Sequence, residues 1–221
     1  SVRTNGTSRN YGLYVSAAGL NVLRANNVIS SGTATASHGM YINGDGKNDI
    51  AFNTIVANAS DSAGMNMTSP NNNITNNTIR STSIMALWLN ASASTNLIYN
   101  NQFNGSTSSV VISGTPVNMW NTSNHSGTNI MGGSMIGGNL YANTAQTEFG
   151  QTCADANLDG ICDASNTIAA NNVDSYPLWV PFDASVNSCR NLTRANTNYT
   201  LTQNVNSTGT CFQIINNDIT L

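Results

Sequence analysis

The sequence predicts an all-β protein: a right-handed parallel β-helix, which is a solenoid of stacked coils, with a C-terminal β-strand extension. The first observation is an Asn-x-apolar motif that recurs at Asn26, Asn53, Asn77 and Asn101, at intervals of 27, 24 and 24 residues. The second is a series of short alternating apolar triplets that lie between these asparagines. A fixed period of this length, carried by triplets too short for helices, is typical of a solenoid.

Each triplet has the spacing of a short β-strand, in which side chains alternate between the inside and the outside of a coil. The triplets occupy residues 13–15, 40–42, 65–67, 87–89 and 110–112. Coils would stack about 4.8 Å apart, so that like residues lie on one another. The aliphatic residues then form an internal stack and the asparagines a ladder, whose amides can hydrogen-bond from coil to coil. Asparagine also tolerates the left-handed backbone of a turn.

The composition also fits a second interpretation, a disordered low-complexity chain, because Asn, Ser and Thr are abundant. Disorder, however, goes with few apolar residues and high charge. Here 39% of the residues are hydrophobic and 8% are charged, which favours an ordered solenoid. The net charge of −3, with seven scattered basic residues, predicts no binding of nucleic acid. No apolar run reaches the roughly 18 residues of a membrane span, so none is expected.

Three segments are expected along the chain. Residues 1–138 form the coils, 139–182 a closing segment with an acidic loop, and 183–221 a β segment resembling the start of another β-helix module. Residue 1 falls inside a coil, and the last segment alternates as strands that lead into a coil do. Two explanations stay open: the chain is a piece of a longer or tandem protein, or the final strands of one subunit complete the coils of the next. The second predicts a head-to-tail filament.

The acidic loop carries the most specific chemistry in the chain. Its Asp-x-Asn-x-Asp-Gly pattern is that of a Ca²⁺ loop, since Ca²⁺ takes six to eight oxygen ligands. The bidentate Glu of an EF-hand would fall at Asn166, so a further ligand must come from elsewhere in the chain. The candidate ligands are Asp155, Asn157, Asp159, the carbonyl of Ile161, Asp163 and, from farther along, Asp174. An acidic turn without metal is the alternative.

The four cysteines fall into two local pairs, Cys153 with Cys162 and Cys189 with Cys211. An even number of cysteines in a secreted protein predicts disulfides. Zinc is the alternative, but the chain has no Cys-x-x-Cys spacing and neither histidine lies near a cysteine.

Asn-x-Ser/Thr sequons are frequent, and N-glycosylation would keep a surface with so few charges in solution. Chance accounts for most of them in a chain of this composition, so their use stays open. The candidate sites are Asn5, Asn58, Asn66, Asn73, Asn76, Asn90, Asn104, Asn121, Asn124, Asn191, Asn198 and Asn206.

The segments 137–141, 155–163 and 171–178 together resemble the closing segment of NosD-like right-handed parallel β-helix proteins. The resemblance covers about residues 1–182, although Leu140-Tyr141 departs from the usual aromatic pair. It implies a β-helix fold, calcium, and a place on the cell surface, where such proteins are common in archaea and some bacteria. It does not extend to copper handling, because no Met, His and Cys cluster offers soft ligands.

The sequence therefore predicts a structural, extracellular cell-surface protein whose subunits assemble head to tail into a filament or surface-layer-like array. One alternative is an adhesin that binds surface glycans through Trp88 or Tyr41. Trp88, in the outward position of its triplet, binds sugar or packs on Tyr41, which holds the same position two coils earlier. A polysaccharide-degrading enzyme of pectin-lyase-like fold is disfavoured, because glycoside hydrolysis needs two carboxylates about 5–10 Å apart. The acidic residues outside the loop are few and scattered, so no enzyme activity is expected.

Overall fold

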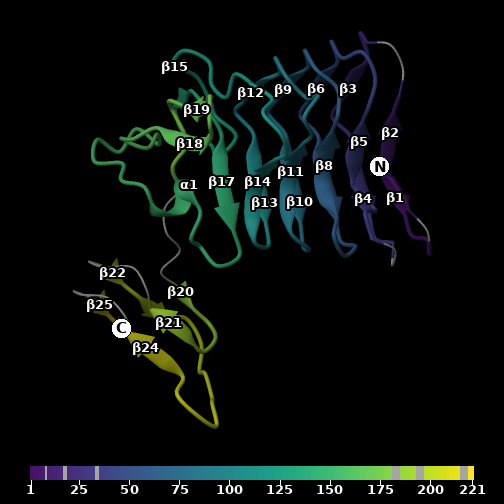
Figure 1. The fold of residues 1–221 in the computed structure, drawn as a ribbon. Helices are drawn as coiled ribbons and strands as arrows, with labels where there is room; N and C mark the ends of the chain where they lie inside the picture. The colour runs from purple at the N-terminus through teal and green to yellow at the C-terminus, as the bar shows by residue number, and fades with distance from the viewer. Residues whose placement is uncertain (8, 17–18, 33–34, 181–184, 193–196, 215–218) are drawn as a thin grey trace. The chain divides into compact units, whose positions relative to one another are not determined.

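The computed structural model of the protein describes residues 1–7, 9–16, 19–32, 35–180, 185–192, 197–214 and 219–221. The chain forms two compact units, residues 1–180 and 181–221 (Figure 1). The expected closing segment is thus continuous with the coils, because it belongs to the first unit through Val180. No helix in the described ranges is long and apolar enough to cross a membrane.

Three parallel sheets build the first unit, and successive strands along the chain pass from one sheet to another. The first sheet contains β1 (Val2–Thr4), β4 (Asn27–Ser30), β7 (Thr54–Ala57), β10 (Thr78–Ser81), β13 (Gln102–Gly105) and β17 (Leu140–Asn143). The second contains β2 (Leu13–Val15), β5 (Met40–Ile42), β8 (Ala63–Met67), β11 (Met85–Leu89) and β14 (Ser108–Ile112). The third contains β3 (Val22–Arg24), β6 (Asp49–Ala51), β9 (Asn73–Thr75) and β12 (Leu97–Tyr99). This topology confirms the predicted parallel β-helix.

Irregular elements follow the last regular coil. Two antiparallel hairpins form there, one from β15 (His125–Ser126) and β16 (Met135–Ile136), the other from β18 (Asn166–Ala169) and β19 (Asn172–Asp174). The short helix α1 (Phe149–Thr152) follows β17. We call the β18–β19 pair the closing hairpin.

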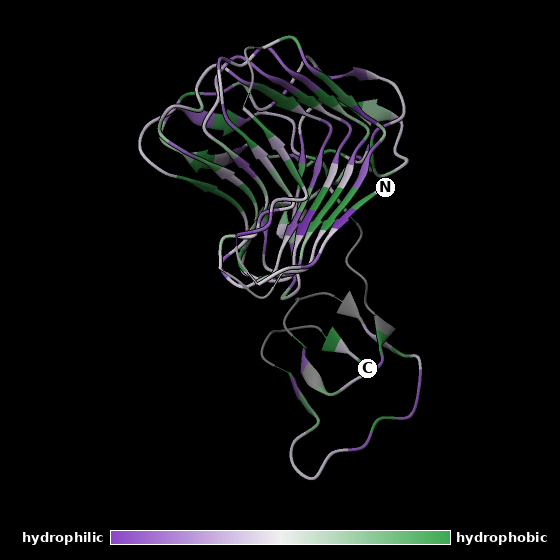
Figure 2. Ribbon diagram, turned by 90° about the vertical axis from the view of Figure 1, so that its right-hand side faces the viewer, coloured by the Kyte–Doolittle hydropathy of each residue, from purple (hydrophilic) through white to green (hydrophobic). Residues whose placement is uncertain are grey.

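The core is a continuous column of inward side chains, as the triplets predict. In the third sheet Ile50, Ile74 and Ile98 are in register and fully buried. The first sheet adds an equivalent line that ends in the larger rings of Phe103 and Tyr141. In Figure 2 the hydrophobic residues recur at equivalent places on successive strands. Complete burial of one such side chain stabilises a fold by about 1.5–3 kcal/mol.

The predicted asparagine ladder is present and longer than expected. Each Oδ1 accepts two hydrogen bonds from the asparagine of the preceding coil, one from its main-chain N–H and one from its Nδ2. Asn77 Oδ1, for example, lies 2.9 Å from both nitrogens of Asn53. The members are Asn26, Asn53, Asn77, Asn101 and Asn139. The closing segment therefore continues the column.

A second ladder, which the sequence period did not predict, runs along the other end of the third sheet. Its members are Asn21, Asn48, Asn72, Asn96, Asn118 and Asn172. Most rungs repeat the double contact of the first ladder, with distances of 2.7 Å and 3.0 Å between Asn48 and Asn72. In the sequence this ladder corresponds to an asparagine two positions before the central residue of each strand of the third sheet. Neighbouring asparagines make this repeat hard to recognise.

The left-handed residue of each turn is the one before the ladder asparagine, and in several turns that residue is itself an asparagine, as expected for this backbone. In the first ladder these residues are Ala25, Phe52, Asn76 and Asn100, with φ between 53° and 59°. Leu20, Lys47, Asn71, Thr95 and Asn171 do the same in the second ladder. A left-handed residue other than glycine costs about 1–2 kcal/mol. The residue that follows this left-handed position is the asparagine whose side chain hydrogen-bonds in the ladder.

The second unit consists of two small stacked coils. Strands β20 (Ser185–Val186), β21 (Arg190–Leu192) and β22 (Thr197–Asn198) pair in parallel with β23 (Thr200–Leu201), β24 (Phe212–Ile214) and β25 (Ile219–Thr220), respectively. Val186, Leu192 and Tyr199 form its buried core. The segment thus contains the β-strand extension that the sequence predicts.

We predict that Asn77→Ala lowers the free energy of unfolding by at least about 3 kcal/mol. The change leaves the two nitrogens of Asn53 and the carbonyl of Ile50 without their buried partner, and each such group costs about 1–3 kcal/mol. Urea unfolding followed by circular dichroism measures this loss. Asn27→Ala is the matched control, because Asn27 is exposed and should change stability by less than about 0.5 kcal/mol. Equal losses for the two variants would show that the ladder adds no stability.

Candidate functional site

Both ladders end on one strand of the closing hairpin. Asn172 Oδ1 accepts the main-chain N–H of Asn118 and the indole N–H of Trp120, at 3.1 Å and 2.9 Å. Two residues on, Asp174 Oδ2 accepts the main-chain N–H of Asn139 at 2.8 Å. Strand β19 therefore supplies the last acceptor of each ladder.

Asp174 occupies the position of a further ladder asparagine. Unlike an asparagine, an ionised aspartate accepts hydrogen bonds but donates none. Its Oδ2 also accepts from Asn139 Nδ2 at 3.3 Å and from the hydroxyl of Tyr141 at 3.0 Å. Its Oδ1 accepts from the N–H of Tyr176 at 3.1 Å. A Cβ at Gly138 would lie 1.8 Å from Oδ1, so only glycine fits there. These contacts make Asp174 the terminus of the first ladder.

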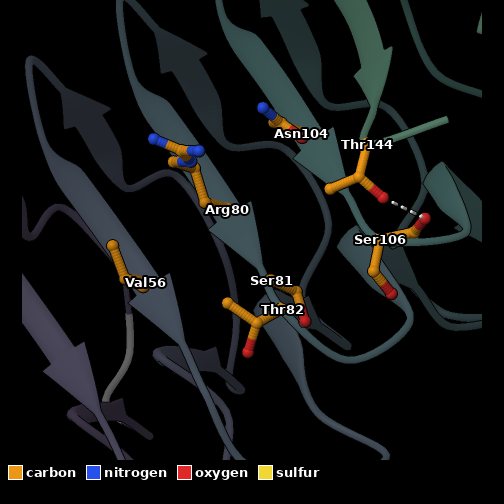
Figure 3. A pocket seen from close by; sticks show the side chains of 7 residues that line it. All are labelled: Val56, Arg80, Ser81, Thr82, Asn104, Ser106 and Thr144. Carbon is orange, nitrogen blue, oxygen red and sulfur yellow. Dashed lines mark hydrogen bonds between the residues drawn. The ribbon is translucent and has the colours of Figure 1, made fainter. Parts of the chain in front are cut away.

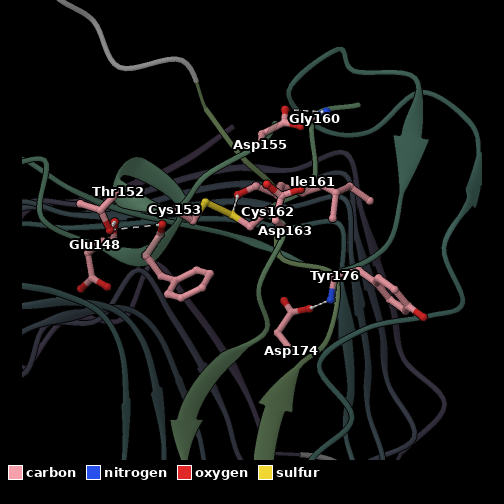
Figure 4. The surroundings of a disulfide bond; sticks show 12 residues. Glu148, Thr152, Cys153, Asp155, Gly160, Ile161, Cys162, Asp163, Asp174 and Tyr176 are labelled. Atoms are coloured by element: carbon pink, nitrogen blue, oxygen red, sulfur yellow. Dashed lines mark hydrogen bonds between the residues drawn. A yellow bond between two sulfur atoms is a disulfide. The ribbon is translucent and has the colours of Figure 1, made fainter. Parts of the chain in front are cut away.

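The prediction that Asp174 completes the acidic loop is corrected by this position. The side chain is fully buried, and both carboxylate oxygens are occupied by donors from 139–141 and 176. In Figure 4 its carboxylate is joined to Tyr176, apart from Asp155. Burial raises the pKa of Asp174 to about 7, although hydrogen bonds from Asn139, Tyr176 and Tyr141 act to lower it. Burial, with the charge of Asp174, also raises the pKa of Tyr141.

The acidic loop folds its side chains onto its own backbone (Figure 4). Asp155 Oδ1 and Asn157 Oδ1 both accept from the N–H of Asp159, at 3.1 Å and 3.2 Å. Asp159 Oδ1 accepts from the N–H of Ile161 at 2.9 Å, and Gly160 turns the chain with φ 86°. Asp163 Oδ2 instead accepts from Ala156 N–H, at 2.9 Å. Three of the predicted oxygen donors thus face one turn, while Asp163 is bonded elsewhere in the loop.

Within the described residues, no group of three or more His, Cys, Asp or Glu side chains is gathered as metal ligands. The loop could supply carboxylate and amide oxygens together with main-chain carbonyls, which are the donors that Ca²⁺ prefers.

Both predicted disulfides are present. Cys153–Cys162 brackets the acidic loop, with Cα atoms 5.7 Å apart. Cys189–Cys211 joins the residues just before β21 and β24, with Cα atoms 4.5 Å apart, and so links the two coils of the second unit. By the chain-entropy model each disulfide stabilises its unit by about 2–4 kcal/mol.

The sequons differ in accessibility. Five asparagines are exposed: Asn5, Asn58, Asn124, Asn191 and Asn206. Asn73, Asn76, Asn90, Asn104 and Asn121 are half-buried, and the side chain of Asn198 lies outside the described residues. Asn66 is 6% exposed with its Nδ2 at 2.8 Å from His38 Nε2, which leaves no room for a glycan on the folded chain.

The two histidines have different surroundings. His125 is exposed. His38 lies in a turn but is 3% exposed, and its Nδ1 accepts from the N–H of Ala63 at 3.0 Å. Burial, with the positive charge of Arg9, lowers the pKa of His38 to about 4. His38 is therefore a neutral packing residue at ordinary pH.

A shallow groove of about 360 Å³ lies over the outer side of the first sheet (Figure 3). Its lining residues are Val56, Arg80, Ser81, Thr82, Asn104, Ser106 and Thr144. One charged side chain, Arg80, and no carboxylate lines it, so it lacks the acid pair of a glycoside hydrolase.

Fold and site together define a parallel β-helix protein whose two ladders close on one hairpin. Residues 1–145 match the family model described as "Periplasmic copper-binding protein (NosD)", which is 145 of the 221 residues. The chain therefore belongs to the NosD family, as the resemblance of its closing segment implied. Comparison with curated proteins and with solved structures gave no match.

We predict that Asp174 makes the protein less stable as the pH rises from about 4 to 7, while His38, whose pKa folding lowers from 6.5 to about 4, acts in the opposite direction up to pH 6.5. Folding raises the pKa of Asp174 from 3.8 to about 7, so in this window the unfolded chain has released a proton that the folded chain still holds. A difference of one pKa unit between the folded and unfolded chain corresponds to about 1.4 kcal/mol, so Asp174 alone contributes a loss of roughly 4 kcal/mol across this window. The shift at His38 offsets roughly 3 kcal/mol of that loss. Urea unfolding at several pH values measures it.

In Asp174→Asn the stability should instead rise with pH up to about 6.5, because the variant has no proton to release at residue 174 and keeps the contribution of His38. Asp61→Asn, at an exposed carboxylate, should retain the pH dependence of the wild type. A profile that is unchanged in Asp174→Asn would show that other groups set the pH dependence.

Proposed function

We propose that this NosD-family protein is a structural β-solenoid of the cell surface whose subunits join head to tail by strand addition. The observation that carries the proposal is the coil formed by β1, β2 and β3. These three strands are the outer members of their sheets in the described part of the chain. The ladders run one way, so Oδ1 of Asn21 and of Asn26 faces the side where another coil would stack.

The hydrogen-bond pattern of β1 shows which backbone groups a new strand would use. Thr4 C=O accepts from the N–H of Ser31 at 2.9 Å, so Thr4 faces β4. By the alternation of a parallel ladder, the N–H and C=O of Arg3 face the opposite side. The parallel two-coil second unit of another copy has the strand polarity to add here.

Two disulfides support a place outside the reducing cytoplasm, because disulfides persist in oxidising compartments. Glycans on the exposed sequons would add to the solubility of a surface of low charge. We propose no catalytic role, since carboxylates are scattered and the groove of Figure 3 has none.

We propose no copper site for the donors that are bonded or buried in this structure, although the family's description names copper binding. Copper sites use His, Cys and Met ligands. Both ring nitrogens of His38 are within hydrogen-bond distance of protein groups, and all the cysteines described are in disulfides. Met40, Met65 and Met67 are fully buried in the column. Calcium in the acidic loop is the metal that we propose instead.

We predict that the purified protein forms concentration-dependent head-to-tail oligomers, visible by light scattering and as filaments by negative-stain electron microscopy. Arg3→Pro should abolish them, because proline removes the outward N–H that a new strand would bond. Arg3→Lys is the matched control and should assemble as the wild type does. A wild-type protein that stays monomeric at every concentration would contradict the proposal.

We predict that Ca²⁺ raises the melting temperature of the first unit and that EGTA lowers it again. A ligand at 100 times its Kd stabilises a fold by about 2.7 kcal/mol. Asp159→Ala should abolish the effect, whereas Asp45→Asn, at an exposed carboxylate of another turn, should not. Identical melting curves with Ca²⁺ and with EGTA would contradict the calcium proposal and show that the loop is an acidic turn that binds no metal.

A further inference from the structure

The outer face of the second sheet carries an aromatic line that crosses successive coils. Its members, in register from β2 to β14, are Tyr14, Tyr41, Asn66, Trp88 and Val111. The rings of Tyr14 and Tyr41 stack with their centroids 5.4 Å apart and their planes at 8°. Tyr11 stacks on both, at 5.6 Å and 5.0 Å. The rings therefore form one ordered surface.

His38 fills the gap that Asn66 leaves between the tyrosines and Trp88. Its ring lies 6.1 Å from that of Tyr41 and 6.0 Å from that of Trp88. The indole is turned by 79° from the imidazole, and its Nε1 donates to Ser113 Oγ of the next coil at 2.9 Å. Trp88 is thus held along the column instead of joining the stack. Its packing partner is His38, and no ring contact between Trp88 and Tyr41 occurs among the described residues.

A second line runs beside the first, two residues farther along each strand. Its members are Ser16, Asn43, Thr68, Asn90 and Ser113, and their main-chain bonds to the neighbouring coil place them in register. All five are uncharged side chains that can both donate and accept hydrogen bonds. The ten positions of the two lines contain no charged residue.

We propose that this face, the aromatic line of Tyr14, Tyr41 and Trp88 with the amide and hydroxyl line beside it, binds a chain of uncharged pyranose sugars. The C–H groups of a pyranose pack on the electron-rich face of an aromatic ring. Because Tyr14 and Tyr41 stack on each other, Trp88 is the ring of the line that lies outside the stack and offers this contact. The hydroxyls of the sugar need nearby groups that donate and accept, which the second line supplies. Coils repeat every ~4.8 Å, close to the length of one sugar ring, so that successive sugars meet equivalent positions. Neither line offers an ion-pair partner to the carboxylate of a uronic acid, although one positive charge, that of Arg9, acts on His38 beside them.

The ligand is a glycan from outside the protein and not a glycan of its own. Asn90 is a sequon within the second line, but its Nδ2 donates to Asn66 Oδ1 and to the carbonyl of Met67 at 3.1 Å. That atom would have to leave both partners to carry a sugar. The binding face lies along the wall of the column, whereas assembly uses the coil of β1–β3. The two surfaces meet at Tyr14 in β2, while Tyr41 and Trp88 lie on later coils.

The test is a glycan array that carries both uncharged and uronic-acid oligosaccharides, followed by calorimetry with the best uncharged hexasaccharide. We expect binding of an uncharged chain and a loss of about tenfold in affinity for Trp88→Ala, the scale of one aromatic contact. Tyr14→Ala should also weaken binding; Tyr14 is 50% exposed, so the fold does not depend on it. Phe52→Ala is the control, because Phe52 is 57% exposed outside this face and should bind as the wild type does.

Three results would overturn the proposal. They are no binding of any uncharged chain, a preference for uronic acids, and equal losses for Trp88→Ala and Phe52→Ala. Ser92→Ala removes the Asn90 sequon and separates the two sources of glycan. Unchanged binding in this variant supports an external ligand, whereas binding that occurs only in this variant would assign the face to the protein's own glycan. Melting curves establish that each variant is folded.

Discussion

The structure depends on satisfying buried amide groups from one coil to the next. Every coil turns sharply twice beside the third sheet, and each turn would leave main-chain N–H groups without a partner. The asparagine of the following coil accepts that N–H and the side-chain amide below it, as in the contacts of Asn72 and Asn96. Because an unpaired buried group costs about 1–3 kcal/mol, the ladders fix the register of all three sheets.

A ladder with a direction needs a last acceptor, and the closing hairpin provides two of them. Asn172 ends one ladder and Asp174 ends the other, although they are two residues apart in β19. The carboxyl group of Asp174 suits this place because its two oxygens accept from several donors. The closing hairpin therefore has a structural role in this chain that is separate from the acidic loop.

The ladders and the inward aliphatic residues leave the outer faces free to differ from sheet to sheet. The first sheet presents a shallow groove with Arg80, and the second presents ordered aromatic rings beside uncharged polar side chains. The β1–β3 end of the column, in contrast, presents main-chain groups and amide acceptors. The sugar binding and the head-to-tail assembly that we propose would both leave the core unchanged.

The sequence by itself determined the repeat, the inward positions, the first ladder through Asn101 and the two cysteine pairs, because these lie at short, nearly constant spacings. Only the tertiary structure decided the partners at irregular spacings. Asn101 meets Asn139 after 38 residues and Asn118 meets Asn172 after 54, across inserted hairpins whose length no period predicts. For the same reason the sequence places Asp174 in the nearby acidic loop instead of the ladder. Which side chain lies above another depends on where the chain re-enters the column.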